Sequence, residues 1–387
     1  MSEENKNEFL DINSFEDLDI DKDILRGVFS YGFENPSPIQ KKGIVPFLKG
    51  RDVIAQAQSG TGKTATFCLG VLGNLDIKSL TTQALVLAHT RELALQINNV
   101  FTQIGSYLKP TINVSIKGLS INDNINELKA NPQIVIGTPG RVLDMINKRG
   151  LNVRTLKMLV MDEADEMLSH GFIDQVKDIF RLMPEDIQVG LFSATMPDEF
   201  FEVTKKFMRD PVRILVKSEQ LTLEGINQYY IDVEKNQYKF ETLCELYSIL
   251  TINQSIIYCN NKKVVDDLTF KMRKEGFTVS YIHSNMLPKE REETMSEFRN
   301  GKTRVLISTD LLARGIDVQQ VSVVINYDVP SNIESYLHRI GRSGRFGRKG
   351  VAINFATFYD TDKIKKIEAY YGTVIDEMPA DIHSILK

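Results

Sequence analysis

The stretch that decides the fold is residues 52–64, which read Asp-Val-Ile-Ala-Gln-Ala-Gln-Ser-Gly-Thr-Gly-Lys-Thr. The first four residues predict a short buried strand, and helical periodicity follows the stretch. Gly60 and Gly62 allow the backbone to turn tightly and to bring N–H groups against phosphate oxygens. We therefore predict a phosphate-binding loop, in which Lys63 would reach the β and γ phosphates and Thr64 would bind Mg²⁺.

This loop departs from the generic phosphate-loop pattern at one position, because Ala57 stands where the pattern has glycine. The alternative is a glycine-rich turn with a surface lysine. The strand before the loop and the helix after it favour a phosphate site. The predicted ATP contacts from the loop are Ser59, Gly60, Thr61, Gly62, Lys63 and Thr64.

A second apolar strand runs directly into four residues that read Asp162-Glu163-Ala164-Asp165. Carboxylates at the end of a strand can hold Mg²⁺ and orient an attacking water, and we assign these roles to Asp162 and Glu163. The alternative is the solvated start of a helix, where acidic residues are favoured. Because a phosphate loop precedes this stretch in the chain, we favour the catalytic assignment.

Short apolar runs alternate with helical segments along the chain, which predicts an α/β fold with parallel sheets. Such sheets bind ligands outside the carboxyl ends of their strands. We expect two tandem domains: an N-terminal tail at 1–14, a first domain at 15–216, a linker at 217–224 and a second domain at 225–387. The predicted strands are 52–55, 84–87, 134–136, 158–161, 189–192, 255–258, 278–281, 304–307, 323–326 and 351–355, and two predicted helices are 91–107 and 172–181.

Composition excludes several classes of protein. A chain of 387 residues is too long for one ordinary core and suits two domains. The formal net charge of −4 argues against a protein that coats nucleic acid through bulk charge. The three cysteines are far apart, so we expect neither a disulfide framework nor a zinc site. No apolar run approaches the roughly 20 residues of a membrane span, and the polar start does not resemble a signal peptide.

The motifs of the chain, taken in order, resemble those of DEAD-box ATP-dependent RNA helicases. The resemblance covers roughly residues 15 to 387. Within the family it is strongest to the subgroup of eukaryotic initiation factor 4A and its exon-junction paralogue. It implies two RecA-like domains and RNA-stimulated hydrolysis of ATP to ADP and phosphate, with ATP and Mg²⁺ bound. The matching segments are 32–40, 57–64, 90–94, 138–141, 162–165, 193–195, 308–317 and 338–345.

The resemblance assigns further residues to the nucleotide. The amide of Gln40 can pair with adenine N6 and N7 and select ATP over GTP. Phe33 resembles the aromatic residue that stacks on adenine, although a core aromatic is the alternative. Asp317 would approach the ribose. Arg342 and Arg345, in the second domain, resemble arginine fingers that neutralise the γ-phosphoryl group. The reaction would therefore require closure of the two domains on ATP.

The resemblance also implies contacts with single-stranded RNA that ignore its sequence. Bending of the bound strand would be incompatible with a duplex, so strands would separate locally. The implied residues that couple ATP to RNA are Ser193, Thr195 and His338, and the implied RNA contacts are Arg91, Gly118, Thr138, Arg141, Arg291 and Thr309.

Four residues depart from the family pattern, and all lie on the implied RNA side. His89 replaces a proline, Lys117 a glycine, Asn285 an aspartate and Pro288 a glutamine. Lys117 would offer a phosphate contact of its own. Pro288 suits the first turn of a helix but removes a side-chain hydrogen bond.

Three functions remain open from the sequence. The first is an unwinding enzyme of translation initiation, cytoplasmic and monomeric outside complexes, with RNA and a HEAT-repeat-type scaffold as partners and no membrane association. The second is an RNA clamp locked by ATP in a nuclear, splicing-linked complex. The third is a general ATPase that acts on protein or DNA, for which the arginines of the second domain would be incidental.

Overall fold

The computed structural model describes residues 12–57, 60–118, 120–168, 172–196, 204–215, 226–250, 252–310, 321–343 and 350–379. Contacts divide the chain into two compact units, residues 1–216 and 217–387. Ile12, in the predicted tail, is buried against the core of the first unit. Residues 1–11 and the predicted linker at 217–224 lie outside the described residues.

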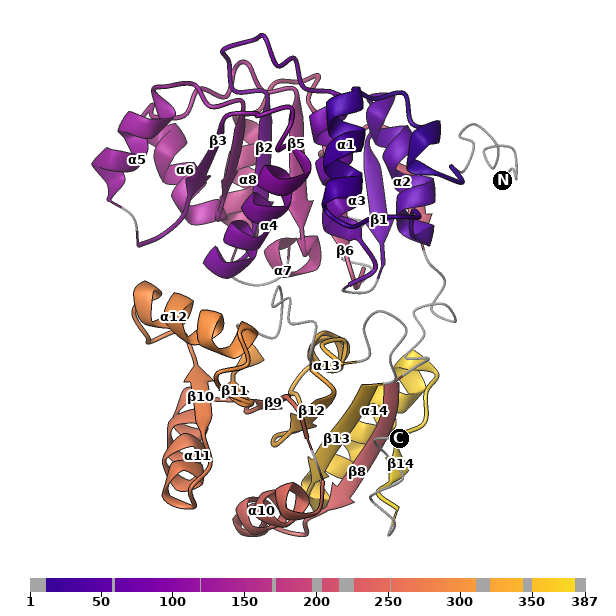
Figure 1. Ribbon diagram of the computed structural model, residues 1–387, viewed down its shortest axis with the longest axis vertical. Coiled ribbons are helices and arrows are strands. Elements are labelled where there is room, and N and C mark those ends of the chain that lie inside the picture. Colours follow the sequence, from indigo (N-terminus) through magenta and orange to yellow (C-terminus); the bar gives the residue numbers. More distant parts are fainter. Residues whose placement is uncertain are drawn as a thin grey trace. The chain divides into compact units, whose positions relative to one another are not determined.

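The first unit is built on a parallel sheet of seven strands in the order β3-β4-β2-β5-β6-β1-β7 (Figure 1). The strands are β1 (Val53–Gln56), β2 (Ala84–Ala88), β3 (Ile112–Ser115), β4 (Ile134–Gly137), β5 (Met158–Asp162), β6 (Gln188–Ser193) and β7 (Val212–Leu215). The main helices are α1 (Lys22–Ser30), α2 (Pro38–Leu48), α3 (Lys63–Gly73), α4 (Arg91–Ile104), α5 (Ile121–Leu128), α6 (Pro139–Asn147), α7 (Ala164–Leu168) and α8 (Ile173–Arg181).

The second unit repeats this design, with seven parallel strands in the order β10-β11-β9-β12-β13-β8-β14. The strands are β8 (Ile226–Asp232), β9 (Ser255–Tyr258), β10 (Val279–Ile282), β11 (Val305–Ser308), β12 (Val323–Asn326), β13 (Gly350–Ala356) and β14 (Asp376–Glu377). The helices are α10 (Lys239–Ile249), α11 (Lys262–Lys274), α12 (Pro288–Arg299), α13 (Ile333–Ile340) and α14 (Thr361–Tyr371), with the short 3-10 turns η2 (Asn236–Tyr238) and η4 (Phe358–Asp360).

The two sheets have the same strand order, so each strand of the first has a counterpart in the second: β1 in β8, β2 in β9, and so on to β7 in β14. The helices follow the same rule, since α3 and α10 follow the first strands, and α4 and α11 the second. We call positions related in this way equivalent. The predicted α/β fold with two tandem parallel-sheet domains is confirmed.

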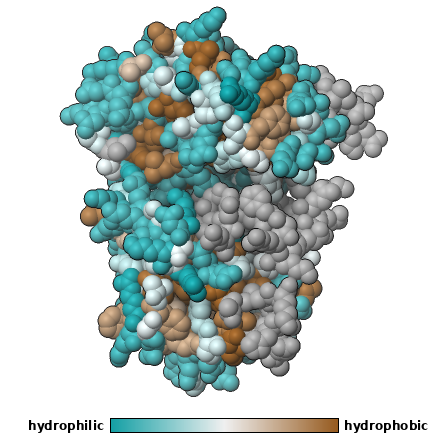
Figure 2. Space-filling model, viewed as in Figure 1, coloured by the Kyte–Doolittle hydropathy of each residue, from teal (hydrophilic) through white to brown (hydrophobic). Residues whose placement is uncertain are grey.

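Both faces of each sheet are covered by helices, which explains why the central strands are apolar on both sides. In β1, Val53 and Ala55 pack into one core cluster, whereas Ile54 between them packs into the cluster on the opposite face. Figure 2 shows hydrophilic and hydrophobic residues interspersed on the viewed face. Among the described helices, none is both long enough and apolar enough to cross a bilayer.

Each predicted strand overlaps an observed one, but the pattern missed β3, β7, β8 and β14. β8 reads Ile-Asn-Gln-Tyr-Tyr-Ile-Asp, and only Gln228 in it is buried. β14 has two residues, both exposed. These strands lie at or next to a sheet edge, where the continuous apolar run of a central strand is not required. The helix predicted at 91–107 ends earlier, at Ile104.

Candidate nucleotide and nucleic-acid sites

The predicted phosphate loop joins β1 to α3 at the carboxyl edge of the first sheet. Gly60 and Gly62 have φ angles of +84° and +99°, in the left-handed region that favours glycine. A Cβ atom on Gly62 would lie 2.5 Å from Nε2 of Gln40 and 3.2 Å from Oγ of Ser37. The loop therefore needs glycine at position 62 for its backbone and for its close contact with α2. Ser59 lies outside the described residues.

Lys63 is the first residue of α3 and is only 5% exposed. Its Nζ donates to the carbonyl oxygen of Ala57 at 2.8 Å and lies 3.8 Å from the carboxylate of Glu163. A buried ammonium group is stable only with such partners. The side chain is thus held inside the loop, where a bound phosphate would contact its ammonium group.

The carboxylates of the Asp-Glu-Ala-Asp stretch sit at the carboxyl end of β5. Asp162 ends the strand, and its carboxylate accepts a hydrogen bond from Thr64 Oγ1 at 3.3 Å. Burial, together with the neighbouring charge of Glu163, raises the pKa of Asp162 to about 7. Two buried carboxylates beside a hydroxyl form an oxygen-rich site of the kind that suits Mg²⁺. The residues present therefore fit this ion.

Glu163 has φ +53° although it is not glycine, so its backbone is strained at the junction between β5 and α7. The side chain is 4% exposed. Residues held in this region cluster at functional sites because the surrounding structure must enforce them. The strain supports a functional role for Glu163 independently of its charge.

Gln40 belongs to α2 and is 2% exposed. Its Oε1 accepts a hydrogen bond from the backbone N–H of Ser37 at 2.8 Å, and its Nε2 lies 3.5 Å from the carbonyl oxygen of Gly62. Phe33 is half-buried, and its ring centroid lies 4.9 Å from that of Tyr31. The structure thus brings Gln40 to the phosphate loop, whereas Asp317 lies outside the described residues.

The implied coupling residues of the first unit also lie beside the loop. Ser193 ends β6, and its carbonyl oxygen accepts a hydrogen bond from the backbone N–H of Ala57 at 3.0 Å. Thr195 is buried and donates through Oγ1 to the carboxylate of Asp165. The segment after β6 is therefore bonded both to the phosphate loop and to α7.

The four implied RNA contacts of the first unit meet at one edge, where the neighbouring strands β3, β4 and β2 end. Gly118 follows β3 with φ +104°, and Thr138 is the N-cap of α6, which carries Arg141. Arg91 is the first residue of α4, and its Nη1 donates to the carbonyl oxygen of Lys117 at 3.2 Å. Exposed backbone N–H groups and cations at this edge suit phosphates.

In the second unit, Thr309 follows β11 and Arg291 lies in the first turn of α12. His338 and Arg342 lie in and just after α13, and Nε of Arg342 donates to the carbonyl oxygen of His338 at 3.2 Å. Both are buried within the described residues. Arg345 lies outside the described residues.

Arg339 is a residue that sequence reasoning missed. Its side chain is fully buried and makes two hydrogen bonds to the carboxylate of Asp310, one of them Nη2 to Oδ2 at 2.8 Å. It also donates to Oδ1 of Asn260 at 2.8 Å and to the carbonyl oxygen of Asp328 at 2.6 Å. One guanidinium group therefore ties α13 to the carboxyl ends of β11, β9 and β12. The sequence feature that could have pointed to Arg339 is its position within the motif at 338–345.

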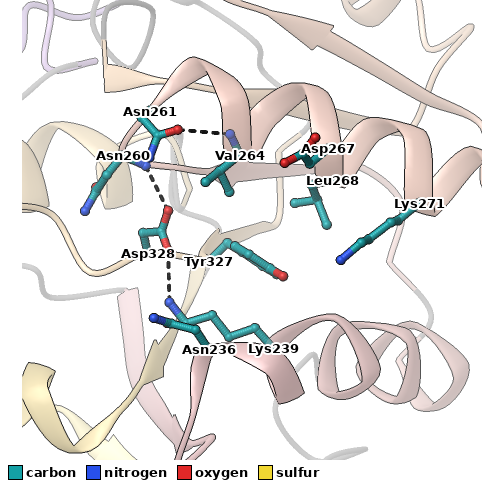
Figure 3. A pocket seen from close by; sticks show the side chains of 10 residues that line it. All are labelled: Asn236, Lys239, Asn260, Asn261, Val264, Asp267, Leu268, Lys271, Tyr327 and Asp328. Carbon is teal, nitrogen blue, oxygen red and sulfur yellow. Dashed lines mark hydrogen bonds and ion pairs between the residues drawn. The ribbon is translucent and has the colours of Figure 1, made fainter.

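A pocket of 410 Å³ opens at the carboxyl ends of β9 and β12 (Figure 3). Lys239, the first residue of α10, is equivalent to Lys63, and it is 3% exposed. Its Nζ lies 2.9 Å from Oδ1 of Asp328, which follows β12 as Glu163 follows β5. The second unit thus keeps the lysine of the nucleotide site but pairs it more tightly with a carboxylate, at 2.9 Å compared with 3.8 Å between Lys63 and Glu163.

Comparison with known proteins identifies the family to which this architecture belongs. Residues 37–203 match the DEAD/DEAH box helicase family, and residues 238–347 match the helicase conserved C-terminal domain. The chain belongs to the DEAD/DEAH box helicase family. This result confirms the resemblance inferred from the motifs.

Relatives within the DEAD-box family match almost the whole chain. The ATP-dependent RNA helicase eIF4A of Debaryomyces hansenii is 57% identical, over 97% of this chain and 95% of its own length. Eukaryotic initiation factor 4A of Caenorhabditis elegans is 56% identical, over 97% of this chain and 93% of its own length.

Solved DEAD-box structures share the fold. S. cerevisiae Dbp5 bound to RNA and ADP BeF3 superimposes with a TM-score of 0.89 and 36% identity, covering 97% of this chain and all of that one. Mss116p bound to ssRNA and AMP-PNP gives a TM-score of 0.86 and 27% identity, covering 95% of this chain and 79% of that one.

Proposed function

We propose that this DEAD-box protein is an RNA-stimulated ATPase that separates short RNA duplexes. The observation that carries the proposal is the buried set formed by Lys63, Asp162 and Glu163 beside a glycine loop. A purely structural role does not explain three ionisable groups in one buried place, since burial of charged groups is costly even when they are paired. A phosphate-binding and phosphate-cleaving role does explain them.

In this proposal the first unit binds ATP. The loop N–H groups and Lys63 hold the β and γ phosphates, and Gln40 and Phe33 hold the adenine. Thr64 and Asp162 would hold Mg²⁺, largely through water, and the ion would supply neutralisation of phosphate charge when bound. Glu163 orients the attacking water and accepts its proton, a task suited to a buried carboxylate near the reacting phosphorus. Lys63 then acts on the oxygens of the γ-phosphoryl group, and Glu163 acts on the water that attacks it.

The second unit supplies the residues that would contact the γ-phosphoryl group in the transition state and the ribose. Arg342 and Arg345 would neutralise the γ-phosphoryl oxygens in the transition state, and Asp317 would approach the ribose. Because these residues belong to the second unit, hydrolysis requires both units to bind one nucleotide. ATP binding would be coupled to RNA binding through Ser193, Thr195 and His338.

RNA would bind across the contacts proposed in both units, namely Arg91, Gly118, Thr138, Arg141, Arg291 and Thr309. Because both ligands favour the same closed arrangement, each should tighten binding of the other. In the closed arrangement the protein bends the bound RNA strand. A bent strand cannot stay paired with its complementary strand, so a short duplex separates.

A relative named eukaryotic initiation factor 4A supports a proposal about the cellular role. We propose that the protein acts in translation initiation, in the cytoplasm, with a HEAT-repeat-type scaffold as partner. The alternative role as an ATP-locked clamp in a splicing-linked complex predicts slow, partner-dependent release of RNA.

Phosphate release measured with and without single-stranded RNA tests the proposed reaction. We expect RNA to increase the rate, and Glu163→Gln to abolish the increase while ATP binding persists. Equal rates with and without RNA would refute the proposal. Stimulation by DNA alone would favour a general ATPase, and slow RNA release that depends on added scaffold would favour the clamp.

A further inference from the structure

Three neighbouring strands of the second sheet each place a buried amide side chain on the same face. They are Gln228 in β8, Asn326 in β12 and Asn354 in β13. Asn326 and Asn354 lie opposite each other in the register of β12 and β13. Gln228 lies opposite Ala352, two residues before Asn354 and therefore on the same face. Strands covered by helices on both faces are usually apolar on both, so these amides depart from the expected pattern.

Helix α13 contacts these amides through Tyr336 and Arg339. The two side chains are fully buried and lie three residues apart, on one face of the helix. Nη1 of Arg339 donates to Oδ1 of Asn326 at 3.2 Å, and Nδ2 of Asn326 donates to Oδ1 of Asn354 at 2.8 Å. Nδ2 of Asn354 donates to the Tyr336 hydroxyl at 3.3 Å, and this hydroxyl donates to Oε1 of Gln228 at 2.9 Å. We call these five residues the α13 network.

The bonds of the α13 network all run in one direction, because each member donates to the next. Inside a protein, hydrogen bonds aligned in series polarise one another and become stronger. Beyond the network, Nε2 of Gln228 donates to Oγ1 of Thr373 at 2.9 Å. At the other end, Arg339 is bonded to the carboxylate of Asp310. The network therefore joins the segment after α14 to the carboxyl end of β11.

Stability alone does not account for the α13 network. Replacement of two buried hydrogen-bonded partners by apolar groups of similar shape is often neutral or stabilising. Apolar packing does not provide direction, since the hydrophobic effect is non-directional whereas hydrogen bonds require alignment. Tyr336 and Arg339 are bonded about one helical turn apart, so the network fixes both the rotation of α13 and its position along its own axis.

The position of α13 determines where Arg342 lies. Arg342 follows the end of the helix by two residues, and its Nε donates to the carbonyl oxygen of His338 within the helix. A rotation or shift of α13 would therefore displace the guanidinium group of Arg342 as well. Misplacement of a catalytic group by about 1 Å can reduce a rate by about 10²-fold.

We infer that Tyr336 is a positioning residue for Arg342 and acts through the α13 network. The inference rests on the proposed function, in which Arg342 contacts the γ-phosphoryl group. In this assignment Tyr336 does not contact the substrate; its hydroxyl holds α13 in the position from which Arg342 acts. Loss of the hydroxyl should therefore lower kcat and leave ATP binding, which belongs to the first unit, unchanged.

The test compares Tyr336→Phe with the parent full chain in steady-state phosphate release at saturating single-stranded RNA. The substitution removes one oxygen atom and keeps the ring. We expect kcat to fall by about tenfold or more, with the KM for ATP and the affinity for AMP-PNP as in the parent protein. A parental kcat would overturn the inference, and so would a lower kcat accompanied by an equal loss of affinity for AMP-PNP.

A double variant separates positioning from stability. Tyr336→Phe alone leaves Oε1 of Gln228 without its donor, whereas Asn354 keeps the carbonyl oxygen of Tyr229 as an acceptor. Tyr336→Phe combined with Gln228→Met removes both partners, so its melting temperature should return toward that of the parent protein. Its kcat should stay as low as in Tyr336→Phe. Recovery of kcat together with the melting temperature would show a purely structural role and overturn the inference.

The matched control is Tyr247→Phe, which makes the same change in another helix of the second unit. The hydroxyl of Tyr247, in α10, is hydrogen-bonded to Oγ of Ser255. Its removal should leave kcat at the parental value. A fall equal to that of Tyr336→Phe would show that loss of any such hydroxyl slows turnover, and it would overturn the assignment to the α13 network.

Arg342→Lys, measured alongside, separates this inference from the proposed function. If the parent protein shows no RNA-stimulated turnover, or if Arg342→Lys turns over at the parental rate, the proposed function fails and the inference fails with it. If both behave as proposed and Tyr336→Phe keeps the parental kcat, only the present inference fails.

Discussion

The ammonium group of Lys63 lies 3.8 Å from the carboxylate of Glu163, and both side chains are about 5% exposed. The two residues come from different elements, one from the start of α3 and the other from the end of β5. Their charges are opposite, yet the separation exceeds that of a tight ion pair. The pair is therefore a loose one, and its two side chains would have to move apart for a phosphate and a water to take their places beside them.

Replacement of Glu163 by glutamine should reduce ATP turnover by about 10²–10⁴-fold, because an amide cannot accept the proton of the attacking water. ATP affinity should change little, since Lys63 and the loop remain. Steady-state phosphate release and binding of a fluorescent ATP analogue measure the two effects. Glu185→Gln, an exposed change in the same unit, is the control, and comparable turnover in the two variants would contradict the assignment.

Gly62→Ala should weaken ATP binding by at least about tenfold, or 1.4 kcal/mol. The new Cβ would lie 2.5 Å from Nε2 of Gln40, so the Gln40 amide must move, and alanine is also strained at φ +99°. Gly50→Ala is the matched control, because Gly50 also has a positive φ but no atom within 4 Å of the added Cβ. Isothermal titration with ATP distinguishes them, and equal loss of affinity in both would show that backbone strain alone is responsible.

Arg339→Lys should destabilise the second unit by about 2 kcal/mol or more, because lysine cannot replace the forked charged hydrogen bonds. Turnover should fall as well, since α13 carries His338 and precedes Arg342. ATP affinity in the absence of RNA should hold, because the proposed binding residues lie in the first unit. Urea unfolding and ATPase assays measure these effects against Arg299→Lys, at the exposed end of α12. Unaltered stability would refute the role of Arg339 as an anchor.

The stabilisation provided by Asp360 should disappear in acid. Burial alone would raise the pKa of Asp360, but hydrogen bonds from Lys363 and Thr357 outweigh it and lower the pKa below the ordinary 3.8. A carboxyl whose folded-state pKa is depressed contributes stability above its unfolded-state pKa, which is lost as pH falls through the folded-state value.

The corresponding variant is Asp360→Asn, which should cost about 1 kcal/mol near pH 7, the usual contribution of a helix cap. Melting temperatures of parent and variant should converge as pH falls below about 4. A difference that stays constant with pH would show that the carboxylate charge is not involved.

Much of the fold was predictable, because buried central strands appear in the sequence as continuous apolar segments. These segments are bounded by glycine-rich or acidic stretches. Ile134–Gly137 and Met158–Asp162 are strands of this kind, buried throughout. β8 could not be found in this way, because an edge-side strand with Asn, Gln and Tyr has no such run. The repeated architecture was predicted, but the equivalence of individual strands was not visible in the sequence, since it resides in strand order.

The site was predictable where one short motif supplies the chemistry, as at Gly62 and Lys63. It was not predictable where a residue acts through distant partners. Arg339 bonds to Asn260, 79 positions away, and this pairing exists only because β9 and β12 are neighbours in the sheet.

The ion pair between Lys239 and Asp328 affects how many ATP molecules one chain can bind. A duplicated fold could hold two nucleotides, one at each set of strand ends. In the second unit an internal carboxylate already occupies the place beside the lysine, and a phosphate would have to displace it against charge repulsion. Equilibrium dialysis should accordingly find one ATP per chain.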